Sequence, residues 1–295
     1  MFGDRLDSRN SMKSYFFLLL LTFSTARCFA AVPASKHVLI VVEENHSYAS
    51  VIGPTSPMPY LNLLASRYGL ATNYYGDTHP SIGNYFMMTT GEVVTNNDGF
   101  TGTVSIDNIV REILLKGKSW KVYAESLPYI GYVGGDAGFY TKHHNPFAYI
   151  TDVVNSSVQK MKMVPFTQLK TDLANNALPD FSFIVPNVCN DAHSCSLSTA
   201  DNWLKTNVAP LLDSSFFQSG GDGILFITFD EGFSTDMAHG GGHVATVVVG
   251  PHVLPAHKDG TFWQHQNLLR TVAIALGLSR YPGMASNCCS MYPMF

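Results

Sequence analysis

"HVLIVVEENHS", residues 37–47, is an apolar, β-branched run that passes directly into a polar cluster. Two other runs have the same form: "FSFIV" at 181–185 precedes "PNVCNDAHSC", and "GILFITF" at 223–229 precedes "DEG". Apolar continuity over this length indicates strands that are buried on both faces, as in a parallel sheet. These three runs decide the fold class, and we expect them to form the centre of one sheet.

Weaker strand candidates and helical patterns lie around these runs. The strand candidates are "WKVYAE" (120–125) and "HVATVVVG" (243–250). Helical patterns cover residues 59–69, 105–117, 166–176, 199–214 and 265–277. Because strands alternate with helices, the sequence predicts an α/β fold, a three-layer sandwich with a mainly parallel central sheet.

The composition is that of a globular protein with one domain. Of 295 residues, 46% are hydrophobic and 14% are charged, which is enough apolar material for one large core. The chain contains no internal repeat, low-complexity tract or linker, so we expect a single domain over residues 32–295. The formal net charge of −4 gives no electrostatic reason to expect a nucleic-acid partner.

The N-terminus has the pattern of a secretory signal peptide. In "MKSYFFLLLLTFSTARCFAA" (12–31), a basic residue, Lys13, precedes a short apolar core and the small residues Ala30 and Ala31. We therefore predict a signal peptide over residues 1–31, with Met12 as a second candidate for the initiating residue. No other apolar run approaches the length of a membrane span. The mature chain is thus expected to lack a transmembrane segment and to be secreted or periplasmic, with its oligomeric state left open.

The cysteines indicate an oxidising compartment. Cys28 is removed with the predicted signal peptide, which leaves an even number in the mature chain. These four residues are Cys189, Cys195, Cys288 and Cys289. Four cysteines allow three pairings, and we predict a Cys189–Cys195 disulfide because it closes a short loop. We expect this loop to hold Asp191 and His193 toward the site. A zinc cluster formed by these cysteines is excluded, because there is no CxxC pair and two of the four are adjacent.

Polar clusters follow each of the three best strands. In open α/β sheets, sites form where the carboxyl ends of the strands meet loops and helix N-termini. The clusters supply oxygen donors, namely Glu43, Glu44, Asn45, Asp230 and Glu231. Oxygen donors suit Mg²⁺, Ca²⁺ or Mn²⁺, while His193 and His243 nearby leave Zn²⁺ open. The sequence therefore predicts one divalent metal ion at this edge.

Ser81, in "HPSIGNYF" (79–86), precedes a run with helical character. The G-x-S-x-G motif of serine hydrolases is absent. From position alone, a serine that opens a helix is most often an N-cap. The same position also suits a nucleophile that attacks phosphorus, because helix N-terminal amides bind phosphoryl oxygens and a metal ion lowers the pKa of a hydroxyl. Both explanations stay open at this point.

Six segments together resemble one enzyme family. They are, in chain order, "EENHS", "HPSIGNYFMMTTG", "KHHNPF", "PNVCNDAHSC", "FDEG" and "GGGHVATVVVGP". In kind and order they are similar to the motifs of the phosphoesterase family that holds secreted acid phosphatases and phosphatidylcholine-type phospholipases C. The resemblance implies an alkaline-phosphatase-like fold, a divalent metal and a covalent phospho-enzyme at a serine or threonine.

The resemblance also implies roles for individual residues. The nucleophile corresponds to Ser81. The metal ligands correspond to Glu44, Asn45, Ser81, Asp230 and Glu231. The groups around the phosphate correspond to Asn84, His144, His193 and His243. Protonated His193 or His144 is expected to donate to the leaving alcohol oxygen, which implies an acid pH optimum.

Two departures from the family pattern bear on the branch. Gly83 stands where proline is usual, and His46 and Ser47 replace the ending typical of the phospholipase branch. "HPS", "KHHNPF" and "NDAHSC" are closer to the acid-phosphatase branch. We therefore expect a secreted, metal-dependent acid phosphatase that hydrolyses phosphomonoesters through a phosphoserine.

Three alternatives remain. The first is a phospholipase C that acts on phospholipid head groups, so that the expected partners are small phosphorylated substrates or those head groups. The second is a metal-independent serine esterase that uses Ser81 with His243 and Asp230. The third is a secreted metal-dependent binding protein, against which the intact serine and both carboxylate pairs argue.

Overall fold

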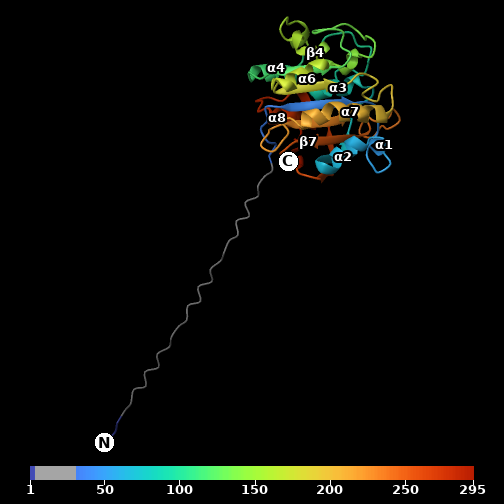
Figure 1. The fold of residues 1–295 in the computed structure, drawn as a ribbon. Coiled ribbons are helices and arrows are strands. Elements are labelled where there is room, and N and C mark those ends of the chain that lie inside the picture. Colours follow the sequence, from blue (N-terminus) through green and yellow to red (C-terminus); the bar gives the residue numbers. More distant parts are fainter. Residues whose placement is uncertain (4–30) are drawn as a thin grey trace.

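The computed structural model describes residues 1–3 and 31–295, and in it one sheet is covered by helices on both faces (Figure 1). Almost all of the predicted signal peptide, residues 1–31, lies outside the described residues. Among the residues that are described, no helix is both long and apolar enough to cross a membrane.

The sheet is mixed but mainly parallel, as predicted. Its strands are β1 (Val38–Glu43), β2 (Gly69–Tyr75), β3 (Trp120–Ala124), β4 (Met163–Pro165), β5 (Phe181–Val185), β6 (Ile224–Phe229), β7 (His243–Val249), β8 (Lys258–Asp259) and β9 (Trp263–Gln264). Their order is β4-β3-β5-β1-β6-β7-β2-β8, and β9 also pairs with β2. Only β7 runs antiparallel to its neighbours, which are β6 and β2. The prediction of an α/β fold with a mainly parallel central sheet is confirmed.

All five predicted helices are present. The helices are α1 (Tyr48–Val51), α2 (Pro59–Arg67), α3 (Ile82–Thr90), α4 (Ile109–Leu115), α5 (Thr151–Val154), α6 (Thr167–Ala174), α7 (Leu197–Leu212) and α8 (His265–Ala275). Short 3-10 turns cover Lys142–His144, Pro146–Ala148, Lys160–Lys162, Gly283–Ser286 and Tyr292–Met294. Helix α3 packs against α8, and α2 packs against α7.

The centre of the sheet consists of β5, β1 and β6, in which every residue is buried. The register pairs Val41 with Ile184 of β5 and with Ile227 of β6, so the three strands end at nearly the same level. The backbone pairing continues past the strands, because Asp230 N–H donates to Glu43 O at 3.0 Å. The polar clusters that follow the strands are therefore brought to one edge, as the sequence indicated.

Strand β2 was not predicted from the sequence. The helix predicted over residues 59–69 was too long at its C-terminal end, because α2 stops at Arg67 and Gly69 begins β2. The strand contains Thr72 and Asn73, which are partly exposed and interrupt the apolar pattern. Its hydrogen-bonding partners β7, β8 and β9 lie far away in sequence. A strand of this kind is specified by pairing and leaves little local signal.

Helix α3 is completely buried and ends at Gly91, which has a left-handed φ of 72°. The backbone of Pro282 approaches this glycine so closely that an added Cβ would lie 2.3 Å from Pro282 O. Gly91 therefore combines a conformation that disfavours side chains with a close backbone contact.

We expect Gly91→Ala to destabilise the protein by about 1–3 kcal/mol, because the methyl group adds a backbone clash to the strain of a positive φ. Gly117→Ala is the matched control, since Gly117 has a φ of 71° and no atom within 4 Å of an added Cβ. The control should lose about 1 kcal/mol or less. Urea unfolding of both variants measures the difference, and equal losses would contradict the prediction.

Candidate active site

Beyond the last residue of β1, Glu43, which is itself fully buried, four more carboxylates lie buried just after the parallel strands. Glu44 follows β1, Asp191 follows β5, and Asp230 and Glu231 follow β6, and none is more than 4% exposed. Within residues 31–295, no lysine or arginine nitrogen lies within 4.0 Å of their oxygens, and their only basic partners are histidines. Buried like charges are unfavourable unless they are protonated or neutralised.

Glu44 receives hydrogen bonds on both oxygens. Tyr85 donates its hydroxyl to Oε1 at 2.6 Å, while Ser81 Oγ donates to Oε2 at 3.2 Å and Asn45 Nδ2 donates to the same oxygen at 3.1 Å. Burial raises the pKa of the Glu44 carboxyl well above its usual range, and the charges of Asp230 and Asp191 raise it further. Glu44 is thus the centre of the cluster.

Asn45 connects Glu44 to the carboxylate after β6. Its φ of 56° is left-handed, and its backbone N–H donates to Asp230 Oδ1 at 3.2 Å. The second oxygen of Asp230 is buried and has no hydrogen-bond partner among the described residues. Burial raises the pKa of Asp230 to about 7 even though the Ser81 hydroxyl and the Asn45 amide favour its charged form.

Ser81 stands at the start of α3, but its side chain does not cap the helix. Its backbone is helical, with φ −46° and ψ −46°, and it makes no side-chain cap hydrogen bond. The hydroxyl donates to Glu44, and the N–H of Ile82 is accepted by Asp98 Oδ1 at 3.1 Å. The N-cap explanation of Ser81 is therefore wrong, because the carboxylate of Asp98 satisfies the first-turn amide and leaves the hydroxyl facing the cluster.

Asn84 and His79 hold Glu231. Asn84 Nδ2 donates to Glu231 Oε2 at 3.1 Å, and His79 Nδ1 lies 3.2 Å from Glu231 Oε1. Asn84 Oδ1 also accepts the backbone N–H groups of Asp77 and Thr78. Burial, followed by the charge of Asp230, raises the pKa of Glu231 to about 9. Asn84 therefore connects the start of α3 to the end of β6.

His144 lies between two of the carboxylates. Its Nε2 is 3.2 Å from Glu44 Oε1, and its Nδ1 is 3.2 Å from Asp191 Oδ2. The ring is 1% exposed and stacks on Tyr85 with centroids 5.1 Å apart. Burial, followed by the charge of His193, lowers the pKa of His144 to about 3. A neutral imidazole between carboxylates fits a metal ligand better than the proton donor expected from the sequence.

The tightest potential metal ligands are Glu44, His144 and Asp191, whose ligand atoms lie within 4.8 Å of one another. The sequence placed Glu44 in the metal site but assigned His144 to the phosphate. It did not assign Asp191 as a ligand. The available signal for Asp191 was its position in the loop after β5, at the same edge as the other carboxylates.

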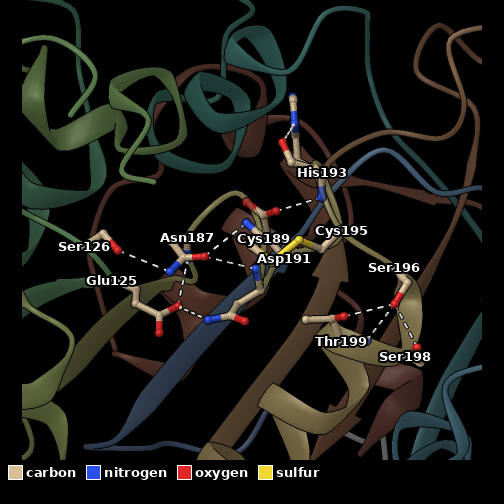
Figure 2. Close-up of a disulfide and its surroundings, with 12 residues drawn as sticks. Glu125, Ser126, Asn187, Cys189, Asp191, His193, Cys195, Ser196, Ser198 and Thr199 are labelled. Carbon is tan, nitrogen blue, oxygen red and sulfur yellow. Dashed lines mark hydrogen bonds between the residues drawn. A yellow bond between two sulfur atoms is a disulfide. The ribbon is translucent and has the colours of Figure 1, made fainter. Parts of the chain in front are cut away.

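Figure 2 shows the loop that carries Asp191. The Cys189–Cys195 disulfide closes it, as predicted. Glu125 Oε2 accepts the backbone N–H of Asn187 at 3.0 Å at the start of this loop, and Asp191 O accepts the N–H of Glu44 at 2.8 Å. The loop is thus attached both to the end of β3 and to the end of β1, which fixes Asp191 in the cluster.

His193 lies at the rim of the cluster. In Figure 2 its side chain points away from the disulfide, and Nδ1 lies 3.0 Å from Ser194 Oγ. The ring is exposed, with its centroid 5.7 Å from that of His144. The other two cysteines, Cys288 and Cys289, are free thiols in this structure.

His243 is placed apart from the carboxylates. Its Nε2 is hydrogen-bonded to Thr72 O at 3.1 Å, and its ring stacks on Tyr48 and Tyr75 with centroids 4.4 and 4.9 Å away. A triad of Ser81, His243 and Asp230 is not assembled, because the serine donates to Glu44. The other expected site residues form one connected cluster, with His193 beside it.

The donor set fits a divalent cation. Asp191 Oδ2 and Asp230 Oδ2 are buried and have no hydrogen-bond partner among the described residues, and both belong to carboxylates with raised pKa values. Carboxylate oxygens with one imidazole nitrogen are ligands that divalent metals accept. A bound cation would neutralise charges that the described part of the chain leaves uncompensated.

The sequence matches one protein family over most of its length. The Phosphoesterase family profile matches residues 54–279. The chain is 32% identical over 251 residues to the Kluyveromyces lactis protein named "Probable acid phosphatase", covering 81% of this chain but 58% of that protein. It is 32% identical over 260 residues to the "Phosphatidylinositol-3-phosphatase" of Mycobacterium tuberculosis, covering 88% and 82%. The chain thus spans little more than half of the fungal relative.

A solved structure of another protein has a similar fold. A Vibrio parahaemolyticus protein described as belonging to the alkaline phosphatase superfamily superposes with a TM-score of 0.57, covering 84% of this chain and 68% of that chain. The sequence identity is 16%, so this likeness concerns the fold alone. The expected alkaline-phosphatase-like fold is confirmed.

We expect the stability of the chelated protein to fall between pH 7 and pH 9. Burial raises the pKa of Asp191 and Asp230 to about 7 and that of Glu231 to about 9. Between pH 7 and pH 9 the folded state keeps the proton of Glu231, which the unfolded state has lost, so the unfolding free energy decreases across this window. The contributions of Asp191 and Asp230 to the same decrease fall mostly below pH 7. Burial lowers the pKa of His144 to about 3, so its opposite contribution is complete below this window.

Thermal unfolding in EDTA at a series of pH values measures this effect. Excess divalent cation should reduce the slope, because it neutralises the same carboxylates. Asp230→Asn in EDTA should also show a smaller slope, because loss of the Asp230 charge lowers the pKa of Glu231. Stability of the chelated wild type that rises from pH 7 to pH 9 would contradict the prediction.

Proposed function

Because this chain belongs to the Phosphoesterase family, we propose that it is a secreted or periplasmic, metal-dependent acid phosphatase that hydrolyses phosphomonoesters through a phosphoserine at Ser81. The observation that carries the proposal is the Ser81 hydroxyl, which donates to Glu44 within a cluster of buried carboxylates. A serine whose hydroxyl is free of capping and directed at potential metal ligands is suited to attack on phosphorus.

The location follows from two features. The predicted signal peptide over residues 1–31 directs the chain out of the cytoplasm. The Cys189–Cys195 disulfide suits an oxidising compartment.

We assign the metal ligands to Glu44, His144 and Asp191, with Asp230 beside them. The earlier set, which also included Asn45, Ser81 and Glu231, is compatible with this position only in part, because Glu231 is held by Asn84 and His79. A divalent cation supplies positive charge that stabilises the negative phosphoryl oxygens and the serine alkoxide. Asn45 keeps Glu44 and Asp230 at a fixed separation.

In the first step, Ser81 Oγ forms a bond to phosphorus while the bond to the leaving alcohol oxygen breaks. The serine proton moves to Glu44 Oε2, which already accepts it as a hydrogen bond at 3.2 Å. We assign His193 at the rim as the group that protonates the leaving oxygen. A proton donor of this kind predicts an acid pH optimum.

In the second step, water attacks phosphorus while the bond to Ser81 Oγ breaks and inorganic phosphate is released. His193, which lost its proton in the first step, accepts the water proton, and Glu44 returns its proton to Ser81. Asn84 orients Glu231 and the backbone at 77–78, and so positions the start of α3. We assign His243 to the packing of the site edge, because it stacks between Tyr48 and Tyr75. Both steps are displacements at phosphorus, with Ser81 as the nucleophile in the first and as the leaving group in the second.

A phosphoinositide head group is a second candidate substrate. The relative named Phosphatidylinositol-3-phosphatase is matched over 82% of its length, more completely than the fungal relative. Its name denotes a phosphomonoester as substrate, so the chemistry at Ser81 would be the same. Parallel assays on p-nitrophenyl phosphate, on a short-chain phosphatidylinositol 3-phosphate and on p-nitrophenyl phosphorylcholine separate the two candidates and the phospholipase C alternative.

Ser81→Ala should reduce phosphatase turnover at least about 10³-fold, since it removes the nucleophile. The same change should lower the free energy of unfolding by about 1 kcal/mol, because the side chain makes one hydrogen bond and does not cap the helix. Ser182→Ala is the control, since Ser182 is also fully buried but lies within β5. Acid-quenched wild type should carry a phosphorylated Ser81 in peptide mass spectrometry; activity retained in Ser81→Ala would refute the assignment.

Asp191→Asn should weaken divalent-cation binding about tenfold or more, because it removes one charged ligand from the cluster. Calorimetric titration of the chelated protein measures this affinity. Asp213→Asn makes the same change at an exposed residue and should leave the affinity unaltered. EDTA should also remove wild-type activity, and readdition of the cation should restore it. Equal affinities in the two variants would exclude Asp191 as a ligand.

A further inference from the structure

Asp98 lies against the first turn of α3, beside the proposed nucleophile. It belongs to the long connection between α3 and α4. This connection is in close contact with the helix, because a Cβ added at Gly83 would lie 2.7 Å from Asn96 Oδ1. Asp98 Oδ1 accepts the backbone N–H of Ile82 at 3.1 Å. A carboxylate from another segment therefore takes the place of an N-cap.

Among the first amides of α3, that of Ile82 has no backbone acceptor in the described part of the chain. The N–H of Gly83 reaches Pro80 O at 3.4 Å, and the N–H of Asn84 donates to Ser81 O at 2.9 Å. First-turn amides are the donors with which helices bind phosphate and other anions. The amide that directly follows Ser81 is thus suited to a phosphoryl oxygen but is occupied by a carboxylate.

Asp98 also acts on the charged groups of the site. Its charge adds to the burial and to the Asp230 charge that raise the pKa of Glu231. It opposes the burial that lowers the pKa of His144. Because Asp98 accepts the amide that directly follows Ser81, a phosphoryl group that approaches Ser81 meets its negative charge.

We propose that Asp98 competes with the phosphoryl group of the substrate for the Ile82 amide, and so sets the affinity of the site for phosphate anions. This inference rests on the proposed function, because it takes Ser81 as the attacking residue. When substrate binds, a phosphoryl oxygen replaces Asp98 Oδ1 as the acceptor of the Ile82 N–H, and the carboxylate turns away. No covalent bond of Asp98 changes, so it determines affinity and is not a catalytic residue.

This competition has a consequence for turnover. Orthophosphate, the product, carries the same phosphoryl oxygens as the substrate and meets the same occupied donor and the same negative charge. Asp98 therefore weakens product binding together with substrate binding, and its return to the Ile82 amide assists product release. A site without this carboxylate would bind phosphate more tightly and would be inhibited by its own product.

The test uses the full-length mature protein saturated with the divalent cation that gives the highest activity. Asp98→Ala removes both the charge and the acceptor, while Asp98→Asn removes the charge but keeps an oxygen that can cap Ile82. The matched control is Asp107→Asn, because Asp107 lies on the same connection, is 40% exposed and pairs with Arg111 at 3.7 Å. The measured quantities are kcat and KM for p-nitrophenyl phosphate and the inhibition constant of orthophosphate.

We expect Asp98→Ala to lower both KM and the orthophosphate inhibition constant about tenfold without raising kcat, the equivalent of one hydrogen bond to a charged group. Asp98→Asn should lower both constants by a smaller factor, and Asp107→Asn should change neither. If Asp98→Ala does not fold, Asp98→Asn carries the test alone. Unchanged or raised constants in folded variants would overturn the proposal and leave Asp98 as a helix cap.

Calorimetry separates this inference from the proposed function. Orthophosphate binding to Ser81→Ala is compared with binding to the double variant that also carries Asp98→Ala, so no turnover is needed. Tighter binding by the double variant supports the competition, and equal or weaker binding overturns it. A wild-type protein without phosphomonoesterase activity would contradict the proposed function instead.

Discussion

The structure depends on one electrostatic constraint, the burial of several carboxylates at the carboxyl edge of the sheet. Glu44, Asp191 and Asp230 are fully buried, and within residues 31–295 no lysine or arginine pairs with them. A buried carboxylate without a counter-ion is protonated or unfavourable, and neighbouring carboxylates increase this cost. Hydrogen bonds from Tyr85 and Ser81 offset part of it at Glu44. Protonation or a bound divalent cation would offset the remainder, and Glu44, His144 and Asp191 are placed so that they could hold such a cation.

The backbone imposes this arrangement before any side chain contributes. Parallel pairing aligns β5, β1 and β6, so that their carboxyl ends lie at the same level. Beyond the strands, Asp230 N–H donates to Glu43 O and Glu44 N–H donates to Asp191 O. The disulfide-closed loop is attached to β3 through Glu125. Each carboxylate therefore sits on backbone that is hydrogen-bonded to the next, and the cluster cannot spread without breaking the sheet edge.

The same features explain what the sequence could predict. The central strands were predictable because every residue of β1, β5 and β6 is buried, whereas β2 has partly exposed polar residues and distant partners. Glu44 and Asp230 could be assigned to the site because each directly follows a buried strand. Asp191 could be placed near the site through the disulfide loop, but its contact with His144 depends on how that loop folds and has no local signal. The two explanations of Ser81 had the same local sequence. The side-chain cap is excluded by a contact from Asp98, which no local pattern shows, and the role of nucleophile stays a proposal.

Asn45 illustrates how stability and function are balanced at this site. Its left-handed φ of 56° is unfavourable for a residue other than glycine, by about 1 kcal/mol or more. The conformation persists because its backbone N–H binds Asp230 and its side chain binds Glu44, so one residue connects carboxylates from two strands. Strain and buried charge both lower the stability of the cation-free fold, and the fully buried strands and α3 offset them. In return, a cation that bound this cluster would find the carboxylates already in place, and little reorganisation would oppose its binding.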